Sequence, residues 1–170
     1  PKIEEFNRGD NFGNSYFQVN QKRGTRWSGT RGFLRPVLDR PNLVVMTQAQ
    51  VLKINTQQVA GETRATGIQL RTRSNLLVET INARREVILA AGAINSPQLL
   101  QVSGIGPAEL LKAHEIDVVQ DLPGVGENLH DHLQVRIVYK VSNTRTLNQR
   151  MSSLFGKAMM GLEYLLFKTG

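Results

Sequence analysis

The middle of the chain alternates between hydrophobic and polar residues in short runs, which is the pattern of antiparallel β-strands with one buried face. Polar breaks containing Gly or Asn separate the runs. We therefore predict a meander of short antiparallel strands, with segments at 43–47, 49–55, 65–71, 76–81 and 86–91.

The last of these runs differs from the others because it is apolar on both faces. Residues 87–91 read VILAA, the composition of a strand buried inside an α/β sheet. Small residues follow, then Ser96, a good helix N-cap, and Pro97, a good first helical residue. The pattern predicts a buried strand, a tight turn and a helix over 98–102.

The N-terminal part of the chain is less regular. Residues 1–33 are rich in Gly, Asn, Arg and Ser, which predicts an extended, turn-rich segment. Residues 27–38 predict a short helix that ends at Pro36 or soon after it, because proline cannot continue a helix.

The C-terminal part mixes helical and extended patterns. We predict a second helix from Pro107 to about His114 and a helix over 151–168, where leucines recur at helical spacing. Residues 116–119 and 133–141 predict strands, and the Gly- and Pro-containing segment 121–132 between them predicts a loop.

Composition indicates a globular chain, with 40% hydrophobic and 21% charged residues among 170. The absence of cysteine excludes disulfides and thiolate metal sites. The chain begins with Pro1 and ends directly after the last helical pattern, so we expect an internal piece of a longer protein. The apolar stretch 154–167 is too short and too charged to span a bilayer, which leaves a membrane-surface helix or a packed helix as alternatives.

The net charge of +7 is unevenly distributed. Residues 1–85 hold 14 Lys and Arg against 6 Asp and Glu, whereas 86–170 hold 7 against 8. A basic half is compatible with nucleic acid, an anionic cofactor or a solvated surface. Few aromatic residues accompany the cations, which argues against a stacking platform for single strands.

The predicted strand–turn–helix unit suits a flat or anionic ligand. Small residues allow close approach of the backbone, and the free N–H groups and dipole of a helix N-terminus favour negative charge. The same small residues also occur where a strand and a helix simply pack closely, so the unit alone leaves both interpretations open.

A longer motif extends this unit. Residues 92–106 read GAINSPQLLQVSGIG, which resembles the second signature of the glucose-methanol-choline (GMC) oxidoreductases at every specified position. The downstream DLPGVGENLHDH at 121–132 and the upstream RPNLVV at 40–45 are also similar to this family. The closing GLEYLLFKTG at 161–170 resembles its choline dehydrogenase and alcohol dehydrogenase branch. The resemblance covers nearly the whole chain.

The resemblance implies a partial doubly wound FAD/NAD(P)-binding fold of the mixed α/β class, with a crossover β-meander and part of a substrate-binding region. It also implies oxidation of a small alcohol by hydride transfer to the flavin of FAD, with oxygen or a quinone as the open choice of electron acceptor. Residues 1–38 are expected to be a polar extended segment, 39–132 the FAD-binding portion, and 133–170 the start of the substrate-binding region.

The family's motifs also assign candidate cofactor-binding residues. Val51 matches the position whose backbone meets the adenine. Ala90, Ala91 and Gly92 match the strand end near the dinucleotide, and Asn128 and His132 match a loop on the ligand side. With Ser96 at the helix start, the candidate set is Val51, Ala90, Ala91, Gly92, Ser96, Asn128 and His132.

Three family elements are not found in this sequence: the Gly-x-Gly-x-x-Gly motif, the first signature, and the segment with the catalytic histidine. We therefore assign no catalytic residue and expect this piece to be inactive by itself. The compartment stays open between the cytoplasm and a membrane periphery.

The histidines have simpler interpretations than catalysis. His114 follows a helical face and suits the helix C-terminus as a cation. His130 and His132 flank Asp131, but no third ligand is placed by the sequence, so loop hydrogen bonding is favoured over a metal site. Ser96 lacks the surroundings of a nucleophile elbow.

Parts of the sequence also fit two other classes of protein. The segments 103–107 and 122–126 resemble the hairpin of a helix-hairpin-helix DNA-binding module. Lys112 is the only basic side chain between Ser96 and His132, however, and phosphate binding requires nearby cations. We therefore expect no nucleic-acid partner. A stand-alone β-rich binding domain would need closed sheet edges and complete ends.

Overall fold

The computed structural model describes residues 1–9 and 12–168. The chain divides into two compact units. The first, called the central unit below, is Val45–Arg136, and the second, called the terminal unit, combines Pro1–Val44 with Ile137–Gly170. Each unit is described by itself.

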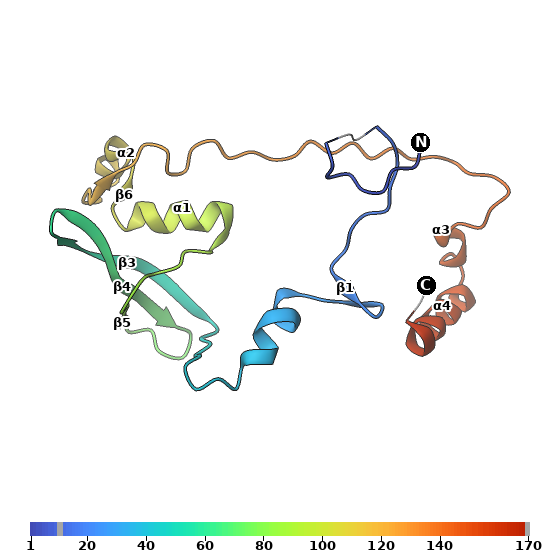
Figure 1. Ribbon diagram of the computed structural model, residues 1–170, viewed down its shortest axis with the longest axis horizontal. Helices are drawn as coiled ribbons and strands as arrows, with labels where there is room; N and C mark the ends of the chain where they lie inside the picture. The colour runs from blue at the N-terminus through green and yellow to red at the C-terminus, as the bar shows by residue number, and fades with distance from the viewer. Residues whose placement is uncertain (10–11, 169–170) are drawn as a thin grey trace. The chain divides into compact units, whose positions relative to one another are not determined.

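An antiparallel sheet dominates the central unit. It contains β3 (Ala49–Val59), β4 (Glu62–Thr72) and β5 (Glu79–Asn82), in that order (Figure 1). Ile54 lies opposite Ile68. The predicted strands at 49–55 and 65–71 are confirmed and extend further, and β5 overlaps the predicted 76–81. The alternating pattern therefore identified the meander correctly.

Glycines shape this sheet at two points. The turn between β3 and β4 has positive φ at both Ala60 (53°) and Gly61 (83°), the conformation that suits two-residue hairpins. At Gly67 on β4, an added Cβ would meet the backbone of Ile81 and Asn82 on β5. The close pairing of β4 with β5 therefore requires glycine at this position.

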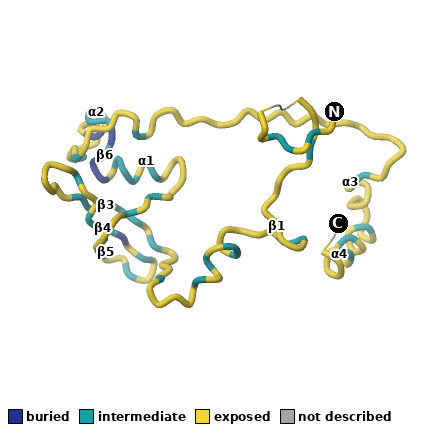
Figure 2. The backbone as a smooth tube through the Cα atoms, in the orientation of Figure 1, coloured by how far each residue is buried: buried dark blue, intermediate teal, exposed yellow. Residues whose placement is uncertain are grey.

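Helix α1 (Gly92–Val102) packs against β3, and a buried serine joins the two. The hydroxyl of Ser103, fully buried just after the helix, accepts a hydrogen bond from the Ile54 N–H at 2.8 Å and donates one to the Leu99 carbonyl at 2.6 Å. Ile54 of β3 and Leu70 of β4 are buried. Figure 2 shows that buried backbone in this unit is confined to short segments, coloured dark blue. One hydroxyl therefore satisfies a strand donor and a helix acceptor at once.

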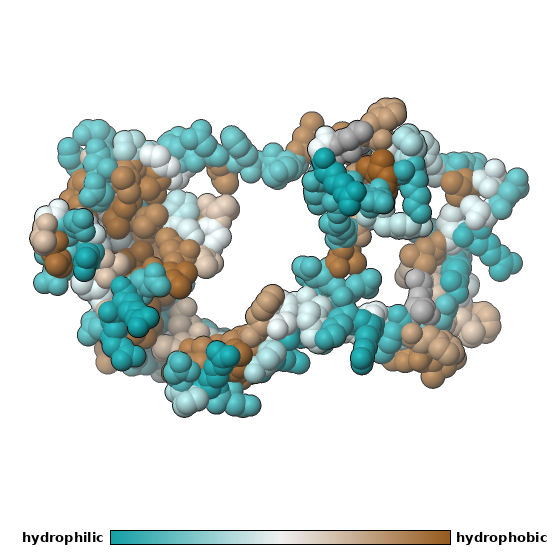
Figure 3. Space-filling view, in the orientation of Figure 1, coloured by the Kyte–Doolittle hydropathy of each residue, from teal (hydrophilic) through white to brown (hydrophobic). Residues whose placement is uncertain are grey.

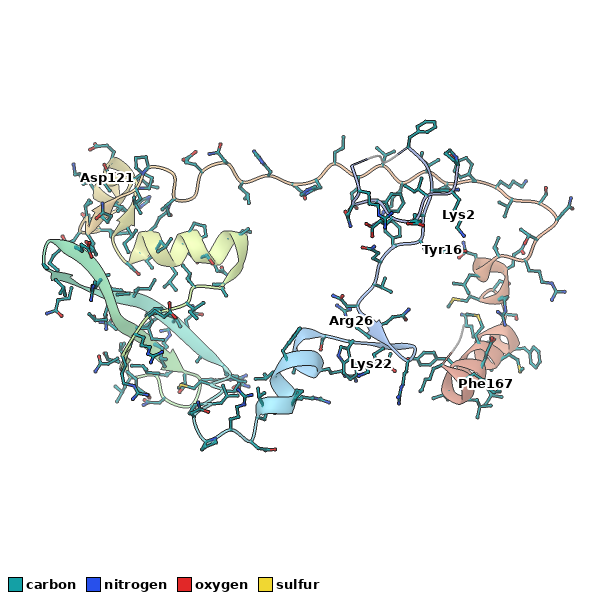
Figure 4. The ribbon with its side chains drawn as sticks, viewed as in Figure 1. Lys2, Tyr16, Lys22, Arg26, Asp121 and Phe167 are labelled. Carbon is teal, nitrogen blue, oxygen red and sulfur yellow. The ribbon has the colours of Figure 1, made fainter. Side chains whose placement is uncertain are left out.

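A short parallel pair follows the helix. Strand β6 (Ile105–Gly106) pairs with β7 (Gln120–Asp121), and α2 (Ala108–Ala113) lies between them in sequence. The carboxylate of Asp121 accepts a hydrogen bond from the Ala108 N–H at 3.0 Å, placing a negative charge at the start of α2 (Figure 4). Leu111 of α2 is buried.

One prediction in this region is confirmed and one is wrong. The helix after Pro107 is confirmed, with Pro107 as its N-cap and His114 as its C-cap. The strand predicted at 116–119 is wrong, because β7 begins only at Gln120 and none of 116–119 is in a strand.

The predicted start of α1 is wrong. The helix begins at Gly92, with Ala91 as N-cap, so Ser96 and Pro97 lie inside it. Gly92 has φ of +89°, which lets the chain turn into the helix before the serine is reached. The Ser96 hydroxyl instead accepts a hydrogen bond from the Ala91 N–H at 3.1 Å.

Three further predicted strands are not formed. Residues 43–47, 86–90 and 133–141 have no strand pairing, and 86–91 is not buried. A strand that is apolar on both faces requires hydrogen-bonded neighbours and covered faces. In the described part of the chain no strand is hydrogen-bonded to 86–91, so this segment has no pairing partner here.

The terminal unit consists of short elements. A hairpin of β1 (Gln21–Lys22) and β2 (Thr25–Arg26) is followed by the helical turns η1 (Thr30–Leu34) and η2 (Arg35–Val37). The helices α3 (Leu147–Arg150) and α4 (Leu154–Phe167) complete it. The helices predicted over 27–38 and 151–168 are thereby confirmed. The last two residues of the family-like segment 161–170 lie outside the described residues.

Polar contacts hold these elements together. The Tyr164 hydroxyl of α4 donates a hydrogen bond to the Gly24 carbonyl of the β1–β2 turn at 3.1 Å. Arg150 pairs with Glu163 at 3.0 Å. Many apolar side chains of α4 stay exposed, as the hydrophobic surface over this helix shows (Figure 3). No helix among residues 1–9 and 12–168 is long and apolar enough to cross a membrane.

Candidate functional site

Two pockets in the central unit share helix α1 as a wall. The larger, of about 770 Å³, lies between the helix and β3 and is called the sheet pocket. The smaller, of about 550 Å³, lies between the helix and the loop 126–130 and is called the loop pocket. Gln98 lines both pockets. Gln98 would therefore contact a ligand in either pocket.

The sheet pocket brings together three candidate residues from two separate segments. Val51 comes from β3, while Ala90 and Ala91 come from the extended segment that leads into α1. Helix α1 also lines this pocket, with residues that include Asn95 and Leu99. Val51 is separated from Ala90 by the whole of β4 and β5, so the fold and not the sequence places them together.

The chemistry of the sheet pocket suits a flat, uncharged ring system. Its walls combine apolar side chains with the amides of Gln50, Asn95 and Gln98, and its described lining contains no charged side chain. Apolar walls with a few placed polar groups are typical of small-molecule and cofactor sites.

The start of α1 offers a complementary site for negative charge. Gly92 has positive φ, and an added Cβ there would meet no atom within 4 Å, so the backbone itself determines the need for glycine. The first turn of the helix contains no acidic residue. Its N–H groups and dipole favour an anion such as a phosphate. Gly92 and Ser96 line neither pocket.

The loop pocket contains Asn128 but not His132. Asn128 has a φ of 56°, a left-handed conformation that asparagine tolerates better than most residues. His132 lies two residues beyond the lining, and its N–H bonds to the Asp131 carboxylate at 2.9 Å. His130 lines the pocket instead. The structure thus separates the two candidate residues of this loop.

Two glutamines of α1 were missed by the sequence interpretation. Gln98 lines both pockets, and Gln101 lines the loop pocket and donates a hydrogen bond from Nε2 to the Val125 carbonyl at 3.1 Å. Residues three apart lie on the same face of a helix, so the Gln98–Gln101 spacing was the available signal. Within the ranges 1–9 and 12–168, no group of His, Asp and Glu is arranged to hold a metal ion.

Comparison with known proteins identifies the family. The model of the GMC oxidoreductase family matches residues 3–134. The oxygen-dependent choline dehydrogenase of Brucella ovis is 48% identical over 147 residues, covering 86% of this chain and 25% of that protein. The alcohol dehydrogenase [acceptor] of Pseudomonas putida is 39% identical over 165 residues, covering 96% and 29%. The chain thus spans about a quarter of the length of these relatives.

Solved structures agree with the sequence comparison. An FAD-dependent oxidoreductase from Chaetomium thermophilum matches with a TM-score of 0.77 and 31% identity, covering 87% of this chain and 25% of that one. Pyridoxine 4-oxidase from Mesorbium loti matches with a TM-score of 0.62 and 27% identity, covering 72% and 23%. The mixed α/β fold class is confirmed, and the comparisons give no support to a DNA-binding hairpin. The chain belongs to the GMC oxidoreductase family.

Proposed function

We propose that the whole protein oxidises an alcohol with FAD as cofactor, and that this chain supplies part of the cofactor site. The observation that carries the proposal is the sheet pocket, where Val51, Ala90 and Ala91 meet beside the start of α1. The printed names of the relatives, choline dehydrogenase and alcohol dehydrogenase, support a choline-like or other primary or secondary alcohol as substrate.

Each part of the pocket has a role in this proposal. The backbone of Val51 and the amide side chains of the sheet pocket would bind the adenine portion of FAD. The strand end at Ala90 and Ala91 and the turn at Gly92 would let the chain approach the dinucleotide closely. The N–H groups at the start of α1 would favour its phosphates. Asn128 and His132 would belong to the ligand side of the loop.

When bound, the flavin of FAD supplies the acceptor for hydride from the alcohol. The residues of this chain bind and orient the cofactor and exclude water from its adenine end. No side chain here is assigned as the base that takes the hydroxyl proton. Either oxygen or a quinone would accept the electrons.

The proposal also divides the chain by role. Residues 39–132 would form the FAD-binding portion, 133–170 the start of the substrate-binding region, and 1–38 an extended polar segment of the FAD and substrate region. Support comes from the central unit, Val45–Arg136, whose limits lie close to those of the FAD-binding portion.

The visible absorption spectrum of the purified full-length protein tests the function. We expect flavin bands that bleach when choline or another alcohol is added without oxygen. A folded protein that is colourless and cannot be reconstituted with FAD would overturn the proposal. The next measurement would then be DNA binding and its dependence on salt.

A further inference from the structure

Gln101 connects α1 to the loop that carries Asn128. Its Nε2 donates a hydrogen bond to the Val125 carbonyl at 3.1 Å, across 24 residues of sequence. The side chain is half-buried and lines the loop pocket together with Gly126 and Asn128. Gln101 is thus the side chain of α1 that is hydrogen-bonded to the backbone just before the pocket loop.

Two glycines enclose this glutamine. An added Cβ at Gly126 would lie 2.8 Å from Gln101 Nε2, and one at Gly106 would lie 3.0 Å from its Cγ. Both distances are shorter than ordinary van der Waals contact, so the backbone closes on the side chain from both directions. Gly126 also has φ of +89°, which turns the chain toward Asn128.

Backbone hydrogen bonds fix the rest of the loop around this contact. The Leu122 N–H bonds to the Gly106 carbonyl at 2.9 Å, which attaches the loop to β6 at one end. The Val125 N–H bonds to the Leu122 carbonyl at 3.1 Å, which closes a turn. The Glu127 N–H bonds to the Gly124 carbonyl at 3.3 Å, which closes a second turn within the loop itself. Among the described contacts, the Gln101 hydrogen bond is therefore the last one before Asn128 that joins the loop to another element of the fold.

We propose that Gln101 is a positioning residue, which holds the 124–128 turn against α1 and so presents Asn128 to bound FAD. This inference rests on the proposed function and deepens it. Gln101 itself need not contact the cofactor. When the Gln101 side chain can no longer donate this hydrogen bond, the turn stays attached to β6 but is no longer attached to α1. Asn128 then moves while the fold persists.

The test compares Gln101→Met and Gln101→Glu in the full-length protein. Methionine preserves the length of the side chain but cannot donate a hydrogen bond, and glutamate presents only acceptors to the Val125 carbonyl. We expect the dissociation constant of FAD, titrated into protein stripped of flavin, to rise roughly 3- to 10-fold for methionine, as for the loss of one hydrogen bond. Glutamate should have the larger effect.

A second variant approaches the same contact from the loop. Gly126→Ala places a Cβ against Gln101 Nε2. The rise in the dissociation constant of FAD that it causes should be smaller in a Gln101→Ala background than in the unaltered protein. Amide hydrogen exchange of the cofactor-free protein should be faster at the hydrogen-bonded amides of Val125 and Glu127 in Gln101→Met, with unchanged exchange in β3 and β4. A role in overall stability alone would raise exchange in both.

The outcomes separate this inference from the function on which it rests. If the unaltered protein binds no FAD, the proposed function is wrong and the inference falls with it. If the unaltered protein binds FAD and Gln101→Met binds it equally tightly, only the positioning role is overturned. Weaker FAD binding together with faster exchange confined to the Val125 and Glu127 amides supports it.

Discussion

The central and terminal units have similar fractions of apolar residues but bury them very differently. In the central unit, Leu111 is 1% exposed and Leu70 is 2% exposed. In the terminal unit no described residue is buried, and Leu154 is 85% exposed. The helix of the central unit lies on a sheet, whereas α4 is attached through the polar contacts of Tyr164 and Glu163. Apolar content becomes a core only where an extended surface faces it.

The largest expected difference between the units comes from leucine truncation. Leu111→Ala should lower the free energy of unfolding by about 2–5 kcal/mol, because it removes buried methyl groups and leaves a cavity. Leu154→Ala, the matched change on an exposed helix of the terminal unit, should change it by no more than about 0.5 kcal/mol. Denaturant unfolding of the chain measures both. Equal losses would show that the two units are buried to the same extent.

A pair of serines, one in each unit, tests the same comparison with smaller expected losses of stability. Ser103→Ala should destabilise the chain by about 1–3 kcal/mol, because the buried Ile54 N–H loses its acceptor. Ser152 in the terminal unit also donates a hydrogen bond to a backbone carbonyl, that of Gln149 at 2.7 Å, but is exposed. Ser152→Ala should cost less than about 0.5 kcal/mol in thermal unfolding. A larger loss for Ser152 than for Ser103 would contradict the assignment of the core.

The smallest expected effect concerns two hairpin turns of the same type. Ala60 and Arg23 each occupy a left-handed position directly before a glycine, with φ of 53° and 51°. Asparagine prefers this position, so Ala60→Asn should stabilise the three-stranded sheet by about 0.5–1 kcal/mol. Arg23→Asn should leave the melting temperature unchanged, because the β1–β2 hairpin has only two residue pairs. A decrease for Ala60→Asn would refute the turn assignment.

The sequence predicts elements whose signals are local. The alternation in 49–55 and 65–71 identified β3 and β4, and the proline at 107 identified the start of α2. The prediction of a strand at 86–91 was wrong because a strand that is apolar on both faces forms only between neighbouring strands, and the local pattern does not show whether these are present. The start of α1 failed because positive φ at Gly92 permits an earlier entry into the helix than Ser96 and Pro97 indicate.

The residues of the candidate site that belong to a family motif could be predicted from the sequence. Those brought to the site only by the fold could not. The family's motifs pointed to Val51, Ala90 and Ala91, and the structure places these residues on one pocket. No motif position points to Gln101, whose interaction with Val125 depends on the loop returning to the helix. Their roles toward FAD remain the proposals made above.

The Ser103 contact also has a consequence for the order of folding. Strands β3 and β4 meet through a two-residue turn, so their pairs form between near neighbours in sequence. Ser103 reaches Ile54 only across 49 residues, and closing that longer loop costs more chain entropy. We expect the hairpin to form early and the helix to dock late. Substitutions at Ser103 should then act chiefly on the rate of unfolding, leaving the rate of folding nearly unchanged.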